Sequence, residues 1–230
     1  MRQLNVFCEG QTEQAFCAQV LQPHLFRSVD GMIHTLAVGE KNNHHLFGLG
    51  KRTKYDRVRK FIQNTIKQKQ NKDVYFTTFF DLYALPDDFP GTAVNSKDTA
   101  NPTPYVRALE QAFENDINHH RFIAHLQLYE YETVLFSDPQ AFAISFESCS
   151  EQIKLLETIT KSVSSIEHIN DGPDTAPSKR IINIFPQYRG RKTTAGPDIA
   201  EHIGIEKIRT ACPHFHHWLT SLERIPWSRE

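Results

Sequence analysis

Acidic side chains stand where three apolar runs of the chain end. The first run ends at Glu9, with Glu13 four residues later. The second run ends at Asp81, and the third ends at Glu130 and Glu132. Because ligands of open α/β sheets bind at the carboxyl ends of the strands, we expect these acids to share one edge. Clustered carboxylates repel one another unless hard cations such as Mg²⁺ or Mn²⁺ neutralise them, and two such ions can catalyse phosphodiester hydrolysis.

The turn at Gly10 is expected to bring two of these acids together. The run Leu4–Cys8 has the character of a buried strand, and a helical pattern follows the glycine, which permits a sharp bend. Glu9 would then lie at the carboxyl end of a strand and Glu13 in the first turn of a helix. Either acid alone could equally favour the positive end of a helix or close a turn, so the hypothesis depends on their joint placement.

Glu130 and Glu132 are separated by one residue. In an extended segment both side chains could face one side, whereas in a helix they would diverge by about 200°. We therefore expect only one of them to bind metal directly, and we favour Glu132.

The elements that must position these acids alternate between strand and helix up to about residue 138. Such alternation favours the α/β class, with a mainly parallel central sheet flanked by helices. We expect strands at about residues 3–8, 31–38, 74–80 and 122–128, and helices at about residues 12–27, 54–70 and 103–117.

After about residue 138 the pattern changes to short helical segments separated by Gly, Pro and Asp. We expect one structural unit in two parts, a metal-binding core at residues 1–138 and a helical extension at residues 139–230 that packs on it. The helices expected in the extension lie at about residues 139–145, 149–162, 177–185, 197–203, 205–211 and 213–224.

The overall charge offers no general attraction to nucleic acid. The 230 residues include 26 Lys and Arg against 27 Asp and Glu, so any basic surface must be local. The stretch Arg189–Lys192 could contact phosphates or be solvated surface. The four cysteines form no CxxC pair, and no apolar run approaches the roughly 20 residues that cross a bilayer. We expect a cytoplasmic protein with no disulfide and no membrane span.

The histidines are not expected to hold metal. The segment Cys212–His217 contains a thiol and three imidazoles, but structural zinc needs four suitably spaced ligands and no CxxC partner occurs elsewhere. We expect His214 and His217 to share a helix face and to have a capping or packing role. His125 lies in an apolar run and is expected to be a hydrogen-bonded core histidine.

Longer motifs surround the acids, and further motifs follow towards the carboxyl terminus. They are Phe7-Cys8-Glu9-Gly10-Gln11-Thr12-Glu13, Phe80-Asp81-Leu82-Tyr83-Ala84-Leu85-Pro86 with Phe89-Pro90-Gly91, Arg121-Phe122-Ile123 through Leu128-Tyr129-Glu130-Tyr131-Glu132 with Leu135–Asp138, Ile169–Gly172 leading to Ala176–Ile181, and Ile208-Arg209 with Cys212–Phe215 and Trp218. Together these motifs resemble the domain-of-unknown-function family 4276 over nearly the whole chain. That family is placed among Toprim-like domains and is similar to the nuclease half of overcoming-lysogenization-defect proteins.

The resemblance implies a Toprim-like nuclease that pairs with an ATPase in anti-phage defence. Glu9 matches the Toprim glutamate after the first strand, and Glu13 matches the acid that helps to hold a second metal. Asp81 matches the first acid of the Toprim Asp-x-Asp pattern, but Tyr83 stands where the second would be. Loss of that ligand would move metal binding to the later glutamates, weaken it, or mark a chain that no longer cleaves. Lys179 resembles the lysine that supports the phosphate, where an ammonium would stabilise charge growing on a phosphoryl group.

These observations lead to one leading hypothesis and two alternatives. The leading hypothesis is an Mg²⁺- or Mn²⁺-dependent nuclease of DNA or RNA, in which Glu9 and Asp81 hold one ion and Glu13 with Glu132 helps to hold another. One alternative is a Toprim-shaped subunit that binds a partner ATPase and is catalytically weak or inactive. The other is a metal-dependent phosphohydrolase of small phosphate esters. A basic groove beside the acids would favour nucleic acid, a closed pocket an ester, and an exposed apolar patch a partner.

Overall fold

A computed structural model gives the structure of the chain. It describes residues 2–29, 31–38, 40–41, 44–45, 54–93, 101–169 and 174–225. The motif residues Asn170–Gly172 lie outside the described residues. Within the described part of the chain, no helix has both the length and the apolar character that spanning a membrane requires.

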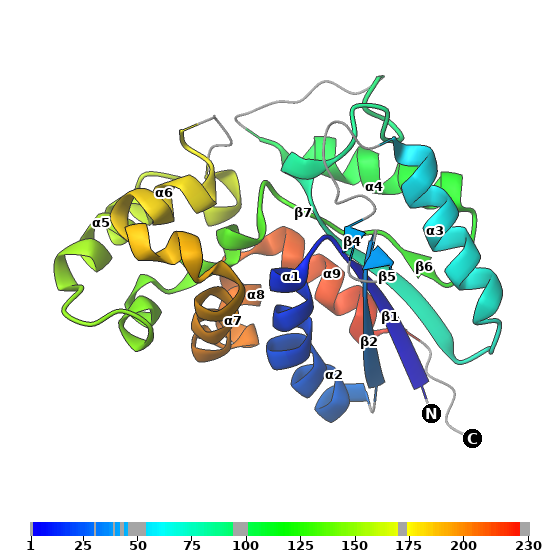
Figure 1. Cartoon of the computed structure of the whole chain (residues 1–230), viewed down its shortest axis with the longest axis horizontal. Coiled ribbons are helices and arrows are strands. Elements are labelled where there is room, and N and C mark those ends of the chain that lie inside the picture. The colour runs from blue at the N-terminus through cyan, green and yellow to red at the C-terminus, as the bar shows by residue number, and fades with distance from the viewer. Residues whose placement is uncertain are drawn as a thin grey trace.

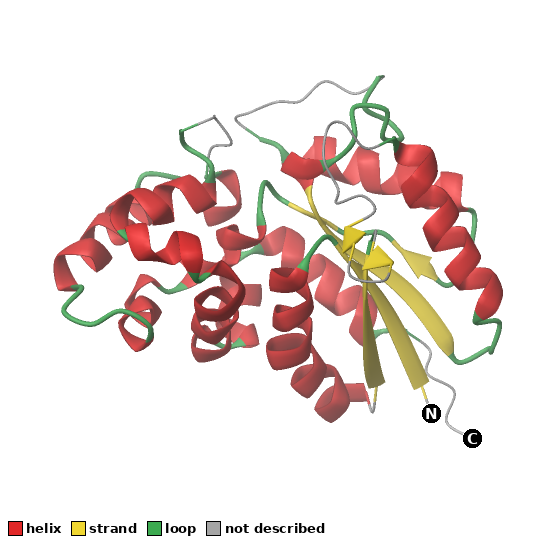
Figure 2. Cartoon of the chain, viewed as in Figure 1, coloured by secondary structure: helices red, strands yellow, loops and turns green. Residues whose placement is uncertain are grey.

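A parallel sheet forms the centre of the molecule, as Figures 1 and 2 show. Its strand order is β2-β1-β5-β6, β7 pairs with the end of β5, and each of these pairings is parallel. This arrangement confirms the expected α/β class with a mainly parallel sheet. The strands of the sheet are β1 (Arg2–Cys8), β2 (Gly31–Ala37), β5 (Val74–Asp81), β6 (Phe122–Ile123) and β7 (Leu126–Gln127). A separate antiparallel pair is formed by β3 (Glu40–Lys41) and β4 (His44–His45).

Helices cover both faces of this sheet (Figure 1). Along β5, Phe76 and Phe80 are buried in the cluster formed with two helices, whereas Phe79 is buried in the cluster on the opposite face. The near-continuous apolar sequence of β5 is typical of a parallel strand that is covered on both sides. The first face carries α3 (Tyr55–Gln68) and α4 (Thr103–Ile117), and the second carries α1 (Gln11–Phe16), a π-helical turn (Cys17–Leu21), α2 (Gln22–Val29) and α9 (Pro213–Glu223).

The helices that follow residue 138 share one buried cluster with β1 and α1. Within that cluster the indole of Trp218 donates a 2.8 Å hydrogen bond to Thr77 Oγ1 in β5, which ties α9 to the sheet. The boundary expected at residue 138 stays a prediction. The helices of this region are α5 (Ser150–Lys161), α6 (Pro177–Ile184), α7 (Lys192–Ile203) and α8 (Ile205–Ala211), with 3₁₀ segments at Tyr131–Ser137, Pro139–Ile144, Ile166–His168 and Pro186–Gly190.

The strand expected at residues 122–128 is interrupted at Ala124 and His125. The backbone amide of Ala124 donates to Glu114 Oε1 at 2.9 Å. Thr78 Oγ1 accepts from the amide of His125 at 2.9 Å and donates to its carbonyl at 2.8 Å. Side chains therefore satisfy the backbone groups that a continuous strand would use in its ladder.

Helix α7 begins one turn earlier than expected, at Lys192. The amides of Thr194 and Ala195 both donate to the carbonyl of Arg191, which closes the additional first turn. Pro197 consequently lies inside the helix. The earlier start places Lys192 on a helix that packs against α1.

Candidate functional site

A polar cavity of about 270 Å³ lies at the carboxyl ends of β1 and β5. All five acids expected at this edge line it, so the structure brings them together. The lining residues are Glu9, Thr12, Glu13, Asp81, Tyr83, Ala84, Glu130, Glu132 and Lys192.

Glu9 and Glu13 are positioned by the turn that connects β1 to α1. The backbone amide of Gly10 donates a 2.8 Å hydrogen bond to Glu13 Oε2, which holds this carboxylate back over the start of the helix. Gly10 was expected to permit a sharp bend, but its φ of −153° is an extended conformation open to any residue, so the bend does not use the conformational freedom of glycine. The chain turns here without a special backbone conformation, and the hydrogen bond to Glu13 is what fixes the first helical turn.

Glu130 and Glu132 are anchored by different kinds of partner, a backbone amide and a lysine. Glu130 Oε2 accepts a 2.8 Å hydrogen bond from the amide of Ser178, in the first turn of α6. Glu132 is buried, and its Oε1 lies 2.9 Å from Nζ of Lys192. The preceding residue, Tyr129, has φ 65°, a left-handed conformation that is uncommon for a bulky side chain. This strained turn redirects the chain from β7 so that both glutamates reach the cavity.

The approach of α7 to the site depends on Gly196. A Cβ at this position would come within 2.9 Å of the hydroxyl of Tyr188 and 3.2 Å of Cε1 of Tyr131. Such contacts are closer than packed side chains tolerate, so the helix can lie this near only because the position is glycine. Lys192, four residues earlier on the same helix, is thereby brought beside Glu132.

Burial raises the pKa values of several acids in the cavity, and the charges of neighbouring carboxylates add to the effect. Burial, followed by the charge of Glu13, raises the pKa of Glu9 to about 8, and burial raises the pKa of Glu13 to about 6. Burial and then the charge of Glu9 raise the pKa of Asp81. Burial also raises the pKa of Glu132, although the neighbouring Lys192 acts in the opposite direction. Near neutral pH the cluster therefore retains protons that isolated carboxylates would release.

The donor atoms of the cavity fit a hard divalent cation. All the acidic ligands are carboxylate oxygens, and two of these atoms, Glu9 Oε2 and Asp81 Oδ1, are buried without a hydrogen-bond partner among the described residues. Within the described residues, no three of these acids bring their oxygens within 4.8 Å of one another. The carboxylates therefore converge on the cavity without forming a compact group of three among the described residues.

Lys179 does not line this cavity; its side chain is exposed in the first turn of α6. It follows Ser178, whose amide binds Glu130, so it lies on the turn that the acid cluster anchors. Its role as a phosphate-supporting cation stays a prediction. Among the described residues, the cation that contacts the cluster is Lys192. It is the last residue of the basic stretch Arg189–Lys192, which the sequence marked only as local positive charge. Burial lowers the pKa of Lys192, but the adjoining carboxylates, Glu132 foremost, raise it overall.

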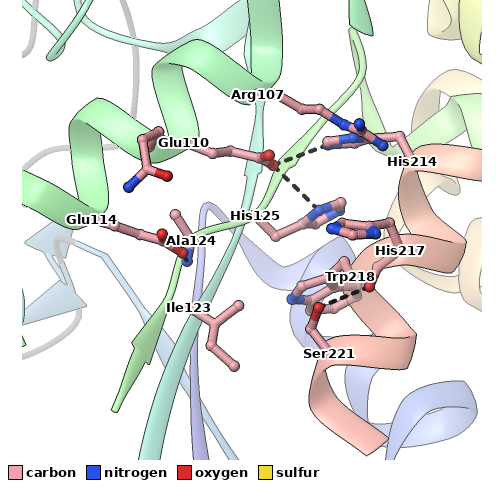
Figure 3. A pocket seen from close by; sticks show the side chains of 11 residues that line it. Arg107, Glu110, Glu114, Ile123, Ala124, His125, His214, His217, Trp218 and Ser221 are labelled. Carbon is pink, nitrogen blue, oxygen red and sulfur yellow. Dashed lines mark hydrogen bonds and ion pairs between the residues drawn. The ribbon is translucent and has the colours of Figure 1, made fainter. Parts of the chain in front are cut away.

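A second polar group lies away from the carboxylate cavity. Glu110, His125 and His214 each offer one ligand atom within 4.8 Å of the others, and such a group could hold a metal ion. Figure 3 shows Glu110 reaching across from α4 towards both imidazoles. No spacing motif indicated this group, because Glu110 lies in α4 and His125 in the break between β6 and β7, whereas His214 comes from α9, far along the chain from both.

A family model described as Domain of unknown function (DUF4276) matches residues 8–223. The match includes all five acids of the cavity, both lysines, and the Glu110, His125 and His214 group. No curated protein matches the chain, and no solved structure matches it.

Proposed function

The chain belongs to the DUF4276 family, and from the carboxylates that converge in its cavity we propose that it is a Toprim-like, divalent-metal-dependent nuclease of DNA or RNA. The observation that carries the proposal is the cavity at the ends of adjacent parallel strands, where Glu9 and Asp81 present buried oxygens without hydrogen-bond partners. Groups of this kind are costly in a folded protein unless a ligand satisfies them. The four cysteines are buried free thiols, which supports a reducing, cytoplasmic setting. The role in anti-phage defence that we propose there follows from the family resemblance alone.

We assign Mg²⁺ or Mn²⁺ to this cavity, with Glu9 and Asp81 holding one ion and Glu13 with Glu132 helping to hold another. When bound, such ions supply an activated water and stabilisation of the leaving oxygen in phosphodiester hydrolysis. Glu130 contributes chiefly as an anchor, because one of its oxygens already accepts from the amide of Ser178. The protein's own part is to hold carboxylates at fixed strand ends and to limit water around them.

Two observations support the alternatives. Tyr83 lines the cavity at the position where the Toprim resemblance would place a second aspartate, which favours a catalytically weak subunit that binds a partner ATPase. The cavity volume of about 270 Å³ suits a small phosphate ester as well as one scissile phosphate of a long chain. We favour the nuclease because several acids of the cavity remain available to bind metal without a second aspartate.

Cleavage of supercoiled plasmid and of a structured RNA tests the proposal. We expect the purified protein to cut at least one of them with Mg²⁺ or Mn²⁺, and EDTA to abolish cutting. The reaction should be repeated with a candidate ATPase, because a restrained nuclease would need its partner. Folded protein that cuts neither substrate under any of these conditions, yet binds the ATPase, would replace the nuclease by the binding subunit. Hydrolysis of a small phosphate ester alone would establish the phosphohydrolase.

The two lysines should differ in the same assay. Lys192 contacts the acid cluster at 2.9 Å and lines the cavity, whereas Lys179 is exposed outside it. An ammonium aimed at a developing phosphoryl charge is worth about 100-fold in rate, so Lys192→Gln should lose about that much. Lys179→Gln, the matched variant, should lose less than about tenfold. A greater loss in Lys179→Gln would assign the supporting role to Lys179, as the family resemblance implies.

A further inference from the structure

A second cavity, of about 230 Å³, lies between α4, the interrupted β6–β7 segment and α9. It shares no lining residue with the carboxylate cavity. Figure 3 shows Glu110 facing His214 and His125, and it shows Trp218 on the far side of His125. We propose that Glu110, His125 and His214 form a metal site for an imidazole-preferring transition ion, of which Zn²⁺ is the commonest.

The state of His125 is the first argument for a ligand. The residue is fully buried, and neither ring nitrogen has a partner of ordinary hydrogen-bond length in the described part of the chain. Burial and then His214 lower the pKa of the ring, and the nearby Gln127 side chain only partly opposes them. Its ring is stacked on Trp218, with the ring centres 4.3 Å apart and the planes inclined by 10°. The sequence-based expectation of a hydrogen-bonded core histidine is therefore not met by this side chain. A buried nitrogen without a partner costs free energy that a metal bond would recover.

The separations of the three ligand atoms suit one small ion. Glu110 Oε1 lies 2.9 Å from His214 Nε2 and 3.6 Å from His125 Nδ1. A tetrahedral ion with bonds of about 2.0–2.1 Å separates its ligand atoms by about 3.3 Å, a value between those two distances. The two imidazole nitrogens lie within 4.8 Å of each other, so side-chain adjustment at the histidines would draw all three atoms around one centre. The carboxylate cavity has no such compact trio among its described acids.

Neighbouring hydrogen bonds hold the ligands before any ion arrives. Glu110 Oε1 accepts from the amide of Leu126 at 2.8 Å. Glu167 caps the start of α9, where its carboxylate accepts from the amides of His214 at 2.8 Å and Phe215 at 3.0 Å. The capping glutamate therefore fixes the turn that carries His214. Outer contacts of this kind orient the ligands in metal sites, and they distinguish a built site from a chance meeting of side chains.

The ligand types determine which ion the site should select. Two imidazoles and one carboxylate favour Zn²⁺ and its transition-metal neighbours, whereas Mg²⁺ and Mn²⁺ prefer the oxygen donors of the other cavity. Three protein ligands beside an open cavity leave a fourth position for water, as in zinc sites that act on a substrate. The metal-free alternative is a hydrogen-bonded pair of Glu110 and His214 with His125 merely stacked on Trp218. The two alternatives differ in what happens when Zn²⁺ is added.

The test is calorimetric titration of metal-stripped protein with Zn²⁺ in excess Mg²⁺, which by the function proposed above would occupy the carboxylate cavity. We expect the wild type to bind one equivalent, and Glu110→Gln and His214→Gln to weaken binding by at least about 100-fold, more than loss of an outer contact costs. Glu110→Gln keeps an oxygen for the amide of Leu126, so it should fold. His202→Gln, which changes an exposed histidine of α7, and Asp81→Asn should bind as the wild type does.

Two further readouts separate binding from misfolding. Zn²⁺ should raise the thermal midpoint of the wild type, because an ion that binds only the folded state stabilises it, and the rise should vanish in His214→Gln. Co²⁺ should give the intense visible absorption of a tetrahedral site with nitrogen ligands. Folded wild type that binds no Zn²⁺ would overturn the proposal, and so would Zn²⁺ binding that Glu110→Gln and His214→Gln leave unchanged.

Discussion

Replacing Asp81 with asparagine should lower the rate of metal-dependent cleavage by about 1000-fold, the largest effect we expect from one substitution. Asp81 is the last residue of β5, and its buried Oδ1 has no hydrogen-bond partner within the described residues. After burial, the four cavity glutamates all raise the pKa of this carboxyl, so the charges of the cluster converge on it. Asparagine keeps the shape and one oxygen but removes the charge that a cation requires. Initial rates of plasmid or RNA cleavage measure the effect.

Asp87→Asn is the matched control, since Asp87 is exposed in the loop after β5 and does not line the cavity. Its rate should stay within about twofold of the wild type, as surface substitutions have small effects. Unfolding in urea excludes loss of activity through misfolding. Burial and the neighbouring glutamates disfavour ionisation of Asp81, so Asp81→Asn should be at least as stable as the wild type without metal. Full activity in folded Asp81→Asn would show that the cavity is not the catalytic centre.

The fold could largely be predicted because its strands carry unambiguous local signals. The run that became β5 is apolar on both faces, a pattern typical of a parallel strand covered on both sides, and the alternation of strands with helices favoured that interpretation. The break at His125 could not be predicted, because it depends on Thr78 and Glu114, whose side chains meet that backbone only after folding. The early start of α7 likewise involves the backbone of Arg191 rather than a sequence signal.

The two polar clusters also differ in how far the sequence could predict them. The acids of the carboxylate cavity stand at or just after strand ends, so the topology of a parallel sheet brings them towards one edge, and local turns complete their placement. Lys192 arrives from a distant helix whose position depends on Gly196, and its only sequence signal was a short basic stretch. Glu110 and His214 meet across more than a hundred residues, and nothing in their local sequence indicates it. Site residues that stand near strand ends could be predicted from the sequence, whereas site residues that are brought in by helix packing could not.

Without divalent metal, the free energy of unfolding should fall by several kcal/mol as the pH rises from about 5 to about 9. The ordinary pKa of Glu9 is 4.5, and in the folded protein it is about 8. Between these values the folded state holds a proton that the unfolded chain has released, so raising the pH favours unfolding. Each unit of difference corresponds to about 1.4 kcal/mol. Glu13, Asp81 and Glu132 act in the same direction, because their pKa values are also raised.

Urea unfolding across this pH range, with and without Mg²⁺, measures the effect. Glu9→Gln should flatten the metal-free profile, whereas Glu151→Gln, at an exposed glutamate paired with Lys154, should reproduce the wild-type slope. His214 also has a raised pKa and contributes a loss on the alkaline side, but it is present in both variants, so their difference isolates Glu9. A metal-free profile that is flat, or equal in the two variants, would contradict the prediction.

Mg²⁺ should remove most of the alkaline loss in the wild type, and much less of it in Glu9→Gln. Below about pH 6 protons neutralise much of the cluster, whereas above about pH 8 this falls to added cations and, among the residues that the structure describes, to Lys192 at Glu132. Metal and protons therefore compete for the same oxygens, and stabilisation by Mg²⁺ should grow with pH. Stabilisation that is equal at both ends of the range would place the ion elsewhere. The carboxylates that destabilise the metal-free protein at high pH are thus the groups by which bound metal would stabilise it.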